Sequence, residues 1–376
     1  MKEISAIYIQ NFEYYIFLKD YCKFFRTLHS HYTLRTIPFM RKESFLQLIA
    51  FLSDYFTKSS NKEKIELFVD RAKNENPWFS EHLIREAMEA VQKQFFDVAA
   101  WDAFFLQHPH QVPASHKVGL ILAGNLPAVG IHDVLMTLAS GNEAYIKLSS
   151  QDKSIMLLYV QAMQEFSSDV PIQLIERLQG MDAVIATGSD FSGSYFAHYF
   201  ATIPHIIRKN RTSIAVLDGS ESQEDFHALA SDVFSYYGLG CRNVSTIAIP
   251  EAYDPTPLFD VLTQYHWVLD HTKYSNNYQY HKTLFLLNQI PHFDLGNLLI
   301  QESQDLVSPV GVVYLRKYAS PDELQSWIQT SEGKIQCIVG AESDHENQVG
   351  FGKSQQPGLS DFADGIDTYA FLTSLS

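Results

Sequence analysis

Short apolar runs alternate with helical segments from Lys117 onward, and this alternation constrains the fold more than any other feature of the chain. The run Lys117–Ala123 has the composition of a strand buried on both faces of a parallel sheet. Further strands are expected at 144–148, 172–177 and 183–186, with helices at 128–138, 152–166 and 191–202. Alternation of this kind predicts a doubly wound sheet that binds ligands at the carboxyl ends of its strands.

A second alternating block starts at Ser213 and predicts a second α/β domain of the same type. Its expected strands are 213–217, 244–249, 310–315 and 334–339, and its expected helices are 222–236, 256–266, 280–290 and 321–330. After the last of these strands, residues 346–361 are rich in Gly, Gln and Ser and are expected to form a loop.

The segment before the first strand is predicted to be helical. An amphipathic pattern begins at Ser44, and Ser80 is placed to cap a helix that reaches Phe96. Residues 1–39 are rich in aromatic side chains, end at Pro38 and are expected to be peripheral. The predicted organisation is an N-terminal extension (1–39), a helical lead-in with a nucleotide-binding domain (40–209), a catalytic domain (210–345) and a C-terminal loop and tail (346–376).

Composition excludes several classes of function. The net charge of −15 disfavours nucleic acid as a partner, because phosphate binding requires a basic face. No apolar run approaches the roughly 18 residues that span a bilayer. The 3 cysteines have neither metal-ligand spacing nor a CxxC pair, so we expect no metal site and a reduced, cytoplasmic protein.

Cys241 is the candidate nucleophile. It follows the turn Gly238-Leu239-Gly240, whose small residues leave the thiol open to substrate. Backbone N–H groups and the adjacent Arg242 are placed to stabilise a thiolate, the reactive form of cysteine. The alternative is a small buried hydrophobic residue in a turn, which is how most free cysteines behave.

Three further turns each follow a predicted strand. They are Gly124–Pro127, Lys147–Ser150 and Thr187–Ser189. Each is a weak motif by itself, and the G-x-G-x-x-G fingerprint of dinucleotide-binding folds is absent. In their order and spacing, together with the Cys241 turn, they resemble the aldehyde dehydrogenase superfamily, whose motifs are approximately P-W-N-F-P, K-P-S-E, F-T-G-S and G-Q-x-C.

Within that superfamily the chain is most similar to the LuxC-type acyl-CoA reductases, which supply fatty aldehyde in bacterial bioluminescence. The similarity lies in A-G-N-L-P, in Y-Y-G-L-G-C-R-N-V-S and in the segment from Gln356 to Asp367, and it covers roughly residues 40–376. The resemblance implies an aldehyde dehydrogenase-like fold with cofactor and catalytic domains. It also implies an acyl-CoA or acyl-carrier thioester as substrate and a homo-oligomer.

The resemblance also assigns roles to single residues. Cys241 would attack the thioester carbonyl, and the Asn125 amide would hold the developing oxyanion; capping of the following helix is the alternative role for Asn125. Lys147 and Ser149 would bind the cofactor ribose or its phosphate, against the alternative of a solvated lysine. Gly188 and Ser189 would contact the pyrophosphate at a helix N-terminus, unless they form an ordinary capping turn.

Two departures from the superfamily pattern bear on the reaction. The Glu that activates water in hydrolytic relatives is replaced, because Ile207-Arg208-Lys209-Asn210 occupies its place. An acyl-enzyme on Cys241 should then resist hydrolysis. Ser150 occupies the place of the Glu in K-P-S-E, so no carboxylate would repel the 2′-phosphate of NADPH. The sequence therefore favours NADPH as the cofactor, with NADH as the alternative.

The expected activity is therefore NADPH-dependent reduction of an acyl-CoA to an aldehyde through a thioester on Cys241. A CoA-acylating aldehyde dehydrogenase running oxidatively would use the same residues. A nucleotide-binding scaffold without turnover would need neither Asn125 nor Cys241. A cysteine hydrolase would need a histidine beside Cys241, and no motif supplies one.

Overall fold

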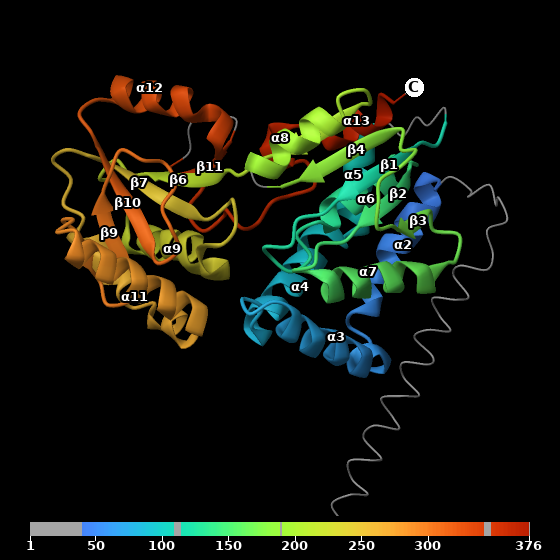
Figure 1. Cartoon of the computed structure of the whole chain (residues 1–376), viewed down its shortest axis with the longest axis horizontal. Coiled ribbons are helices and arrows are strands. Elements are labelled where there is room, and N and C mark those ends of the chain that lie inside the picture. Colours follow the sequence, from blue (N-terminus) through green and yellow to red (C-terminus); the bar gives the residue numbers. More distant parts are fainter. Residues whose placement is uncertain (1–39, 109–113, 189, 342–346, 376) are drawn as a thin grey trace, which may run out of the picture. The chain divides into compact units, whose positions relative to one another are not determined.

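The computed structural model describes residues 40–108, 114–188, 190–341 and 347–375 of the chain (Figure 1). The N-terminal extension 1–39 and Ser189 lie outside the described residues, so the expectations for them remain untested. None of the described helices has both the length and the apolar character needed to cross a membrane.

Among the described residues, four α-helices precede the first strand, in the segment that the sequence predicts to be helical. They are α2 (Lys42–Tyr55), α3 (Lys62–Glu75), α4 (Glu81–Phe95) and α5 (Val98–Gln107). Ser80 caps α4, where its hydroxyl accepts the Leu83 N–H at 3.1 Å. The Phe45 ring of α2 meets the Trp101 ring of α5 edge-on, with ring centroids 4.7 Å apart. Aromatic packing of this kind holds the helices together, and their buried side chains share one hydrophobic core with those of the first sheet.

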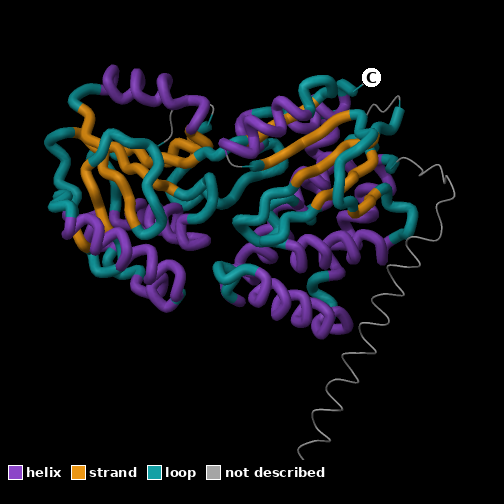
Figure 2. Tube along the Cα trace, in the orientation of Figure 1, coloured by secondary structure: helices purple, strands orange, loops and turns teal. Residues whose placement is uncertain are grey.

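The first sheet is entirely parallel and has the strand order β3-β2-β1-β4-β5. Figure 2 shows strands in orange and helices in purple along the same trace. Its strands are β1 (Lys117–Ile121), β2 (Glu143–Lys147), β3 (Ile172–Leu174), β4 (Ala183–Thr187) and β5 (His205–Arg208). Its connecting helices are α6 (Ile131–Ala139), α7 (Lys153–Phe166) and α8 (Asp190–Tyr199). The order reverses beside β1, so the crevice at the carboxyl ends of β1 and β4 is the expected ligand-binding edge.

The second sheet has seven strands in the order β12-β11-β6-β7-β10-β9-β8. The strands are β6 (Thr212–Val216), β7 (Val244–Pro250), β8 (Phe293–Asp294), β9 (Leu299–Glu302), β10 (Val312–Tyr318), β11 (Ile335–Val339) and β12 (Gln348–Val349). Only β8 pairs antiparallel within these described pairings, so the sheet is mixed. Its helices are α9 (Gln223–Phe234), α10 (Thr256–Leu262), α11 (Thr272–Leu287) and α12 (Pro321–Ser331).

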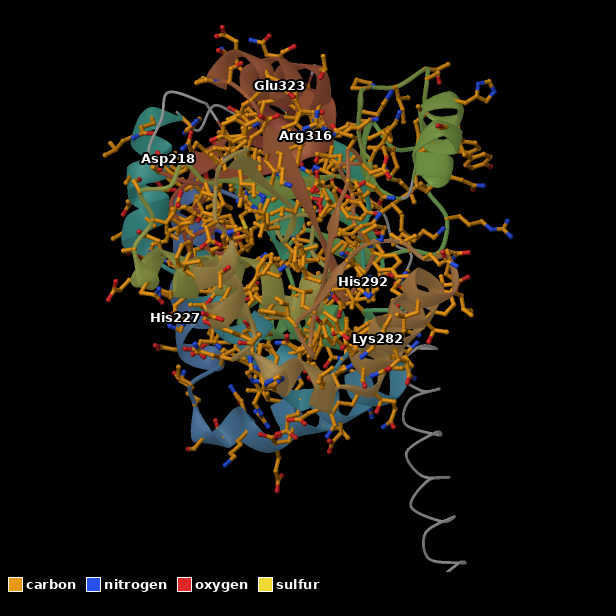
Figure 3. All side chains as sticks on the ribbon, turned by 90° about the vertical axis from the view of Figure 1, so that its left-hand side faces the viewer. Asp218, His227, Lys282, His292, Arg316 and Glu323 are labelled. Carbon is orange, nitrogen blue, oxygen red and sulfur yellow. The ribbon has the colours of Figure 1, made fainter. Side chains whose placement is uncertain are left out.

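Side-chain contacts fix the helices against this second sheet (Figure 3). Arg316 of β10 places its guanidinium 4.5 Å from the centre of the Trp327 ring in α12. Lys282 of α11 pairs with Asp294 of β8 at 2.6 Å. These contacts tie the sheet edge and α12 to the sheet, and the loop that carries Cys241 leads into the amino end of β7.

The C-terminal segment contacts both sheets, which the sequence did not indicate. Strand β12 extends the second sheet, whereas α13 (Thr368–Thr373) packs against α6 beside the first. Arg208, at the end of β5, donates a hydrogen bond to the Thr368 hydroxyl at 2.8 Å. The expected loop and tail is therefore a structural strap between the two sheets.

Candidate active site

The loop before Cys241 has an unusual backbone. Tyr236, Tyr237 and Gly238 follow α9 with φ values of 52°, 56° and 75°, three left-handed residues in succession. For tyrosine this conformation costs on the order of 1 kcal/mol or more, so surrounding contacts must hold it. The turn directs Tyr236 into the pocket described below and Tyr237 into ring contacts with His271, at 4.4 Å between centroids.

Asn243 supplies those surrounding contacts. Its side chain is buried, and its carbonyl oxygen accepts the Gly240 N–H at 2.8 Å. Its amide donates to the Asp232 and Ser235 carbonyls at 3.0 and 2.8 Å. One side chain thus fixes the end of α9 and the loop that carries Cys241. The sequence places Asn243 in the motif but gives no signal for this role.

Cys241 is exposed at the end of this loop. Desolvation by the surrounding protein nevertheless raises the pKa of its thiol to about 11, and the positive charge of Arg242 offsets only part of that rise. The predicted stabilisation of a thiolate is therefore wrong for the free protein: Arg242 acts in the expected direction, but desolvation outweighs it. Cys241 is therefore a thiol at neutral pH.

Asn125 lies beside the cysteine loop. Its amide donates a hydrogen bond to the Leu239 carbonyl, two residues before Cys241, at 3.1 Å. The alternative role as a helix cap is wrong, because α6 begins at Ile131 with Gly130 as its N-cap. The structure thus brings the predicted oxyanion donor and the predicted nucleophile to one place, although they are more than a hundred residues apart in the sequence.

A buried carboxylate supports the turn that carries Asn125. Asp152 is 1% exposed, and its Oδ2 accepts the Ala128 N–H at 2.7 Å. Ala128 has a left-handed backbone with φ of 57°. A Cβ on Gly124 would lie 2.3 Å from the Ser149 hydroxyl, so the close approach of the two turns requires glycine there. Sequence reasoning missed Asp152, which stands two residues after the Lys147–Ser150 turn.

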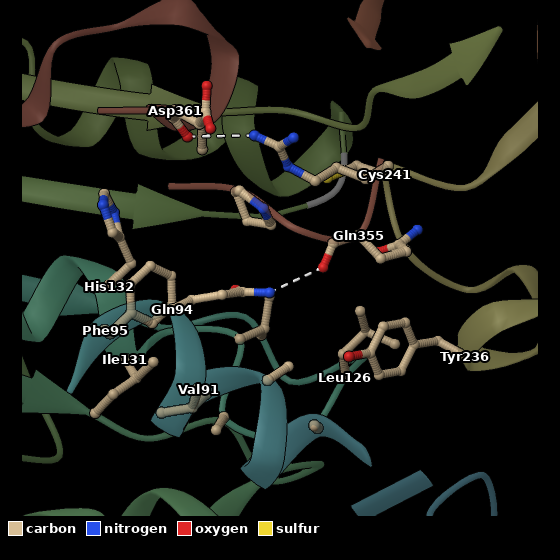
Figure 4. A pocket seen from close by; sticks show the side chains of 18 of the residues that line it. Val91, Gln94, Phe95, Leu126, Ile131, His132, Tyr236, Cys241, Gln355 and Asp361 are labelled. Atoms are coloured by element: carbon tan, nitrogen blue, oxygen red, sulfur yellow. Dashed lines mark hydrogen bonds between the residues drawn. The ribbon is translucent and has the colours of Figure 1, made fainter. Parts of the chain in front are cut away.

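A pocket of about 190 Å³ opens beside Cys241 (Figure 4). One face of α4 lines it with Ala87, Ala90 and Val91, and the lining is mostly apolar. The Gln94 amide donates across it to the Gln355 carbonyl at 3.0 Å. The Gln355 amide nitrogen is buried and has no hydrogen-bond partner among the described residues.

Arg242 attaches the C-terminal segment to the cysteine loop. Its guanidinium donates to the Ser354 and Asp361 carbonyls at 3.3 and 3.2 Å and to the Cys337 sulfur at 3.2 Å. Asp232 of α9 accepts the Ser354 N–H at 3.0 Å. The segment around Gln355 therefore forms one wall of the pocket.

The segment 207–210, which is expected to occupy the place of the water-activating Glu, is fixed in the structure by an ion pair. Ile207 and Arg208 end β5, and Arg208 forms a buried ion pair with Asp133 of α6. Asp364 is the carboxylate whose charge acts on the Cys241 thiol, which sequence reasoning did not identify. It pairs with Arg211 at 3.2 Å, and burial raises its pKa.

The predicted cofactor residues lie at the carboxyl ends of the first sheet. Lys147 ends β2 and is exposed; the Ser149 hydroxyl accepts the Gln151 N–H at 3.2 Å. Gly188 follows β4, but its N–H donates to the Arg208 carbonyl at 3.2 Å. Ser189 lies outside the described residues. The exposed Lys147 ammonium at this edge of the sheet fits a phosphate-bearing nucleotide. The Gly188 N–H does not offer a free donor to a pyrophosphate, because it donates to the Arg208 carbonyl.

The chain has an aldehyde dehydrogenase-like fold, as solved structures show. An oxidoreductase from Marinobacter aquaeolei is 14% identical, with a TM-score of 0.64 and 86% of this chain and 81% of that chain covered. A mutant of aldehyde dehydrogenase C from Pseudomonas syringae, in complex with NAD⁺ and octanal, is 12% identical, with a TM-score of 0.60 and coverage of 81% and 73%.

A third structure, aldehyde dehydrogenase 21 from Physcomitrella patens with the product succinate, is 9% identical, with a TM-score of 0.61 and coverage of 90% and 85%. No protein-family model matches the chain, and no curated protein sequence matches it. The comparisons thus confirm the predicted fold.

Proposed function

We propose that this protein is an oxidoreductase that reduces an acyl-CoA thioester to an aldehyde through a covalent thioester on Cys241. One observation carries the proposal: Cys241 opens onto an apolar pocket and stands in a loop that is hydrogen-bonded to Asn125. A nucleophile, an oxyanion donor and an apolar site for the acyl chain are the parts that acyl transfer requires.

The first half-reaction is transfer of the acyl group. The Cys241 sulfur loses its proton and attacks the thioester carbonyl, and the Asn125 amide stabilises the negative charge on the oxygen. Collapse of this intermediate breaks the bond to the CoA sulfur, which leaves and takes up a proton. Loss of one oxyanion donor costs about 10²–10³ in rate, so Asn125 is assigned a large share of the acceleration.

The second half-reaction needs a hydride, which a bound reduced nicotinamide supplies. Lys147 and Ser149 would hold its ribose or phosphate, with the Gly188 turn beside them. Cys241 then leaves from the thiohemiacetal carbon as the aldehyde forms. We propose NADPH, because Ser150 brings no carboxylate toward a 2′-phosphate. That a similar fold holds NAD⁺ and octanal in the Pseudomonas syringae structure supports a nicotinamide and an aliphatic substrate.

The Arg208–Asp133 ion pair supports reduction over hydrolysis. A paired guanidinium at the place of the water-activating Glu cannot abstract a proton from water, so the acyl-enzyme should persist until hydride arrives. These features agree with the LuxC-type acyl-CoA reductases, to which we propose that the chain belongs. A CoA-acylating aldehyde dehydrogenase working oxidatively would use the same residues and is the second candidate.

A homo-oligomer is part of the proposal. Leu286 and Leu287 at the end of α11 are 61% and 74% exposed, and Phe293 of β8 is 54% exposed. Exposed apolar side chains of this size on α11 and on the edge strand β8 favour contact with another copy of the chain. Sedimentation analysis of the purified protein measures the oligomeric mass.

The test of the activity is an acylation experiment. Wild-type protein with an acyl-CoA and no reductant should gain the acyl mass on the peptide that contains Cys241, and added NADPH should remove that mass and release aldehyde. Cys241→Ser should abolish both signals. Labelling of Cys337 instead, or release of free acid as fast as aldehyde, would contradict the proposal. Assays with aldehyde, CoA and NADP⁺ test the oxidative direction.

A further inference from the structure

The pocket beside Cys241 is built mainly by elements that take no part in the chemistry. Its α4 residues are spaced three, four, seven and eight positions from Ala87, which places them on one face of the helix. They are Ala87, Ala90, Val91, Gln94 and Phe95. The opposite lining comes from residues that follow the Asn125 turn and from the C-terminal segment.

The pocket runs away from the nucleophile toward an aromatic wall. In Figure 4, Cys241 and Tyr236 lie on one side of the pocket, and Phe95, Ile131 and His132 lie on the other. The Phe95 and His132 rings are 5.3 Å apart between centroids, and His132 also contacts Phe362 at 6.0 Å.

His132 is fixed in this wall and is suited to an apolar ligand. Its Nε2 lies 3.1 Å from the Leu359 carbonyl, which holds the ring in place. Burial lowers the pKa of the imidazole, so the ring is neutral at neutral pH. The far end of the pocket therefore offers ring surfaces without charge, which an alkyl terminus can contact at little desolvation cost.

The volume of the pocket limits what it can hold. A methylene group takes up about the space of a water molecule, roughly 30 Å³. The volume of about 190 Å³ then corresponds to about six such groups. A two-carbon acyl group would leave most of the pocket empty, whereas a chain of fourteen or more carbons would overfill it.

We propose that this pocket selects medium-chain acyl thioesters of about six to eight carbons, with the carbonyl at Cys241, the chain along α4 and the methyl end against Phe95 and His132. The inference rests on the proposed function. It assigns α4 as the element that sets substrate length, a role separate from the chemistry of Cys241 and Asn125.

The expected profile follows from burial of methylene groups. Each methylene added within the pocket should raise kcat/KM by about fourfold, which is the rate equivalent of its transfer from water. The rise should end near eight carbons and reverse beyond that length. A ladder of acyl-CoAs from acetyl to hexadecanoyl, assayed with NADPH, measures the position of the maximum.

Two substitutions move the wall in opposite directions. Phe95→Ala removes a ring from the far end, so the maximum should shift to longer chains. Ala90→Leu fills the middle of the pocket, so the maximum should shift to shorter chains. Phe96→Ala is the matched control, because Phe96 is equally buried but packs against Phe56 and Tyr159 outside the pocket. The Phe96→Ala variant should lose stability as Phe95→Ala does, but the acyl chain length that gives the highest kcat/KM should not change.

The possible results are distinct. If the wild type reduces no acyl-CoA and forms no adduct on Cys241, the proposed function fails. If it reduces acyl-CoAs with a flat profile, or with a maximum that neither Phe95→Ala nor Ala90→Leu moves, the activity stands and the length selection by α4 is overturned. Opposite shifts in the two variants, with an unshifted maximum in Phe96→Ala, support it. Chain-length dependence of adduct formation without NADPH gives the same readout independently of the hydride step.

Discussion

Cys241 is an exposed residue, yet its thiol is desolvated and difficult to ionise. Desolvation dominates its environment, although Arg242 stands next to it and directs its guanidinium toward the C-terminal segment. A resting thiol would protect the proposed nucleophile from indiscriminate reaction, because only the thiolate is a strong nucleophile. Under the proposed function, binding of the substrate or the cofactor must then lower the pKa of the Cys241 thiol.

This environment predicts the pH dependence of alkylation. The rate at which iodoacetamide modifies Cys241 should rise about tenfold per pH unit between pH 7 and 10, because the thiolate fraction does so below a pKa of about 11. Peptide mapping by mass spectrometry measures the rate at this residue. The buried Cys337 serves as an internal control and should react far more slowly in the folded protein. A plateau below pH 8 would show a stabilised thiolate instead.

Asp152 predicts a pH-dependent stability. Burial raises its pKa well above the usual range, so its ionised form is disfavoured in the folded state. Its stabilising contribution is present at acidic pH and is lost as pH rises through the raised folded pKa. Asp152→Asn keeps an acceptor for the Ala128 N–H and removes the charge.

The Asn variant should therefore gain stability relative to wild type as pH rises, by about 1–3 kcal/mol once the wild-type carboxyl is ionised. Urea denaturation of both proteins at pH 5 and pH 8 measures the change. Asp152→Ala should instead destabilise the turn and lower kcat, because Asn125 loses its support. An Asn variant whose relative stability falls with pH would contradict the assignment.

At the scale of elements, the sequence predicts the strands and turns that have a recognisable local pattern of residues. The apolar runs of β1, β2, β4, β6 and β7 are recognisable because both faces of these strands are buried. Strand β5 was missed because its four residues His205–Arg208 include a polar residue at each end. The Asn125 and Cys241 turns were predicted from the motifs. The contacts of Asn243, Asp152 and Asp364 were not, because each joins residues brought together only by the folded chain.

The turn after β2 predicts the cofactor preference. Lys147→Ala should raise the KM for NADPH by about tenfold, the effect of one lost charge-assisted contact, and change that for NADH less. Ser150→Glu should shift preference toward NADH by repelling a 2′-phosphate. Steady-state kinetics with both reduced nicotinamides measure the ratio. Gln151→Glu, one position further along the same exposed turn, is the matched control and should have a smaller effect; an unchanged ratio in Ser150→Glu would place the ribose elsewhere.

At the scale of the whole chain, the C-terminal segment is the part that links distant regions. It adds β12 to the second sheet, walls the pocket near Gln355 and ends in α13 against α6. Arg208 connects this end to the first sheet, through the ion pair with Asp133 and the hydrogen bond to Thr368. Because both charges are buried, the pair depends on its geometry being kept.

Asp133→Asn should destabilise the protein by about 3–5 kcal/mol, because Arg208 would stay buried without a countercharge. Denaturant unfolding measures the loss. Glu302→Gln is the matched control, since it neutralises the exposed pair with Lys317, which spans 2.9 Å, and should cost less than about 1 kcal/mol. An equal loss of unfolding free energy in the two variants would show that the buried pair contributes no more to stability than the exposed pair.

The construction of the pocket bears on how proteins of this fold could diversify. The residues proposed for bond making and breaking stand in turns at the ends of strands, whereas a helix outside both sheets supplies one wall of the pocket. A change of one small side chain on α4 leaves those turns untouched. Mutations that change the substrate can therefore occur in a different part of the gene from the codons of the proposed catalytic residues. Descendants of one ancestor can then differ in substrate specificity while they keep the same reaction.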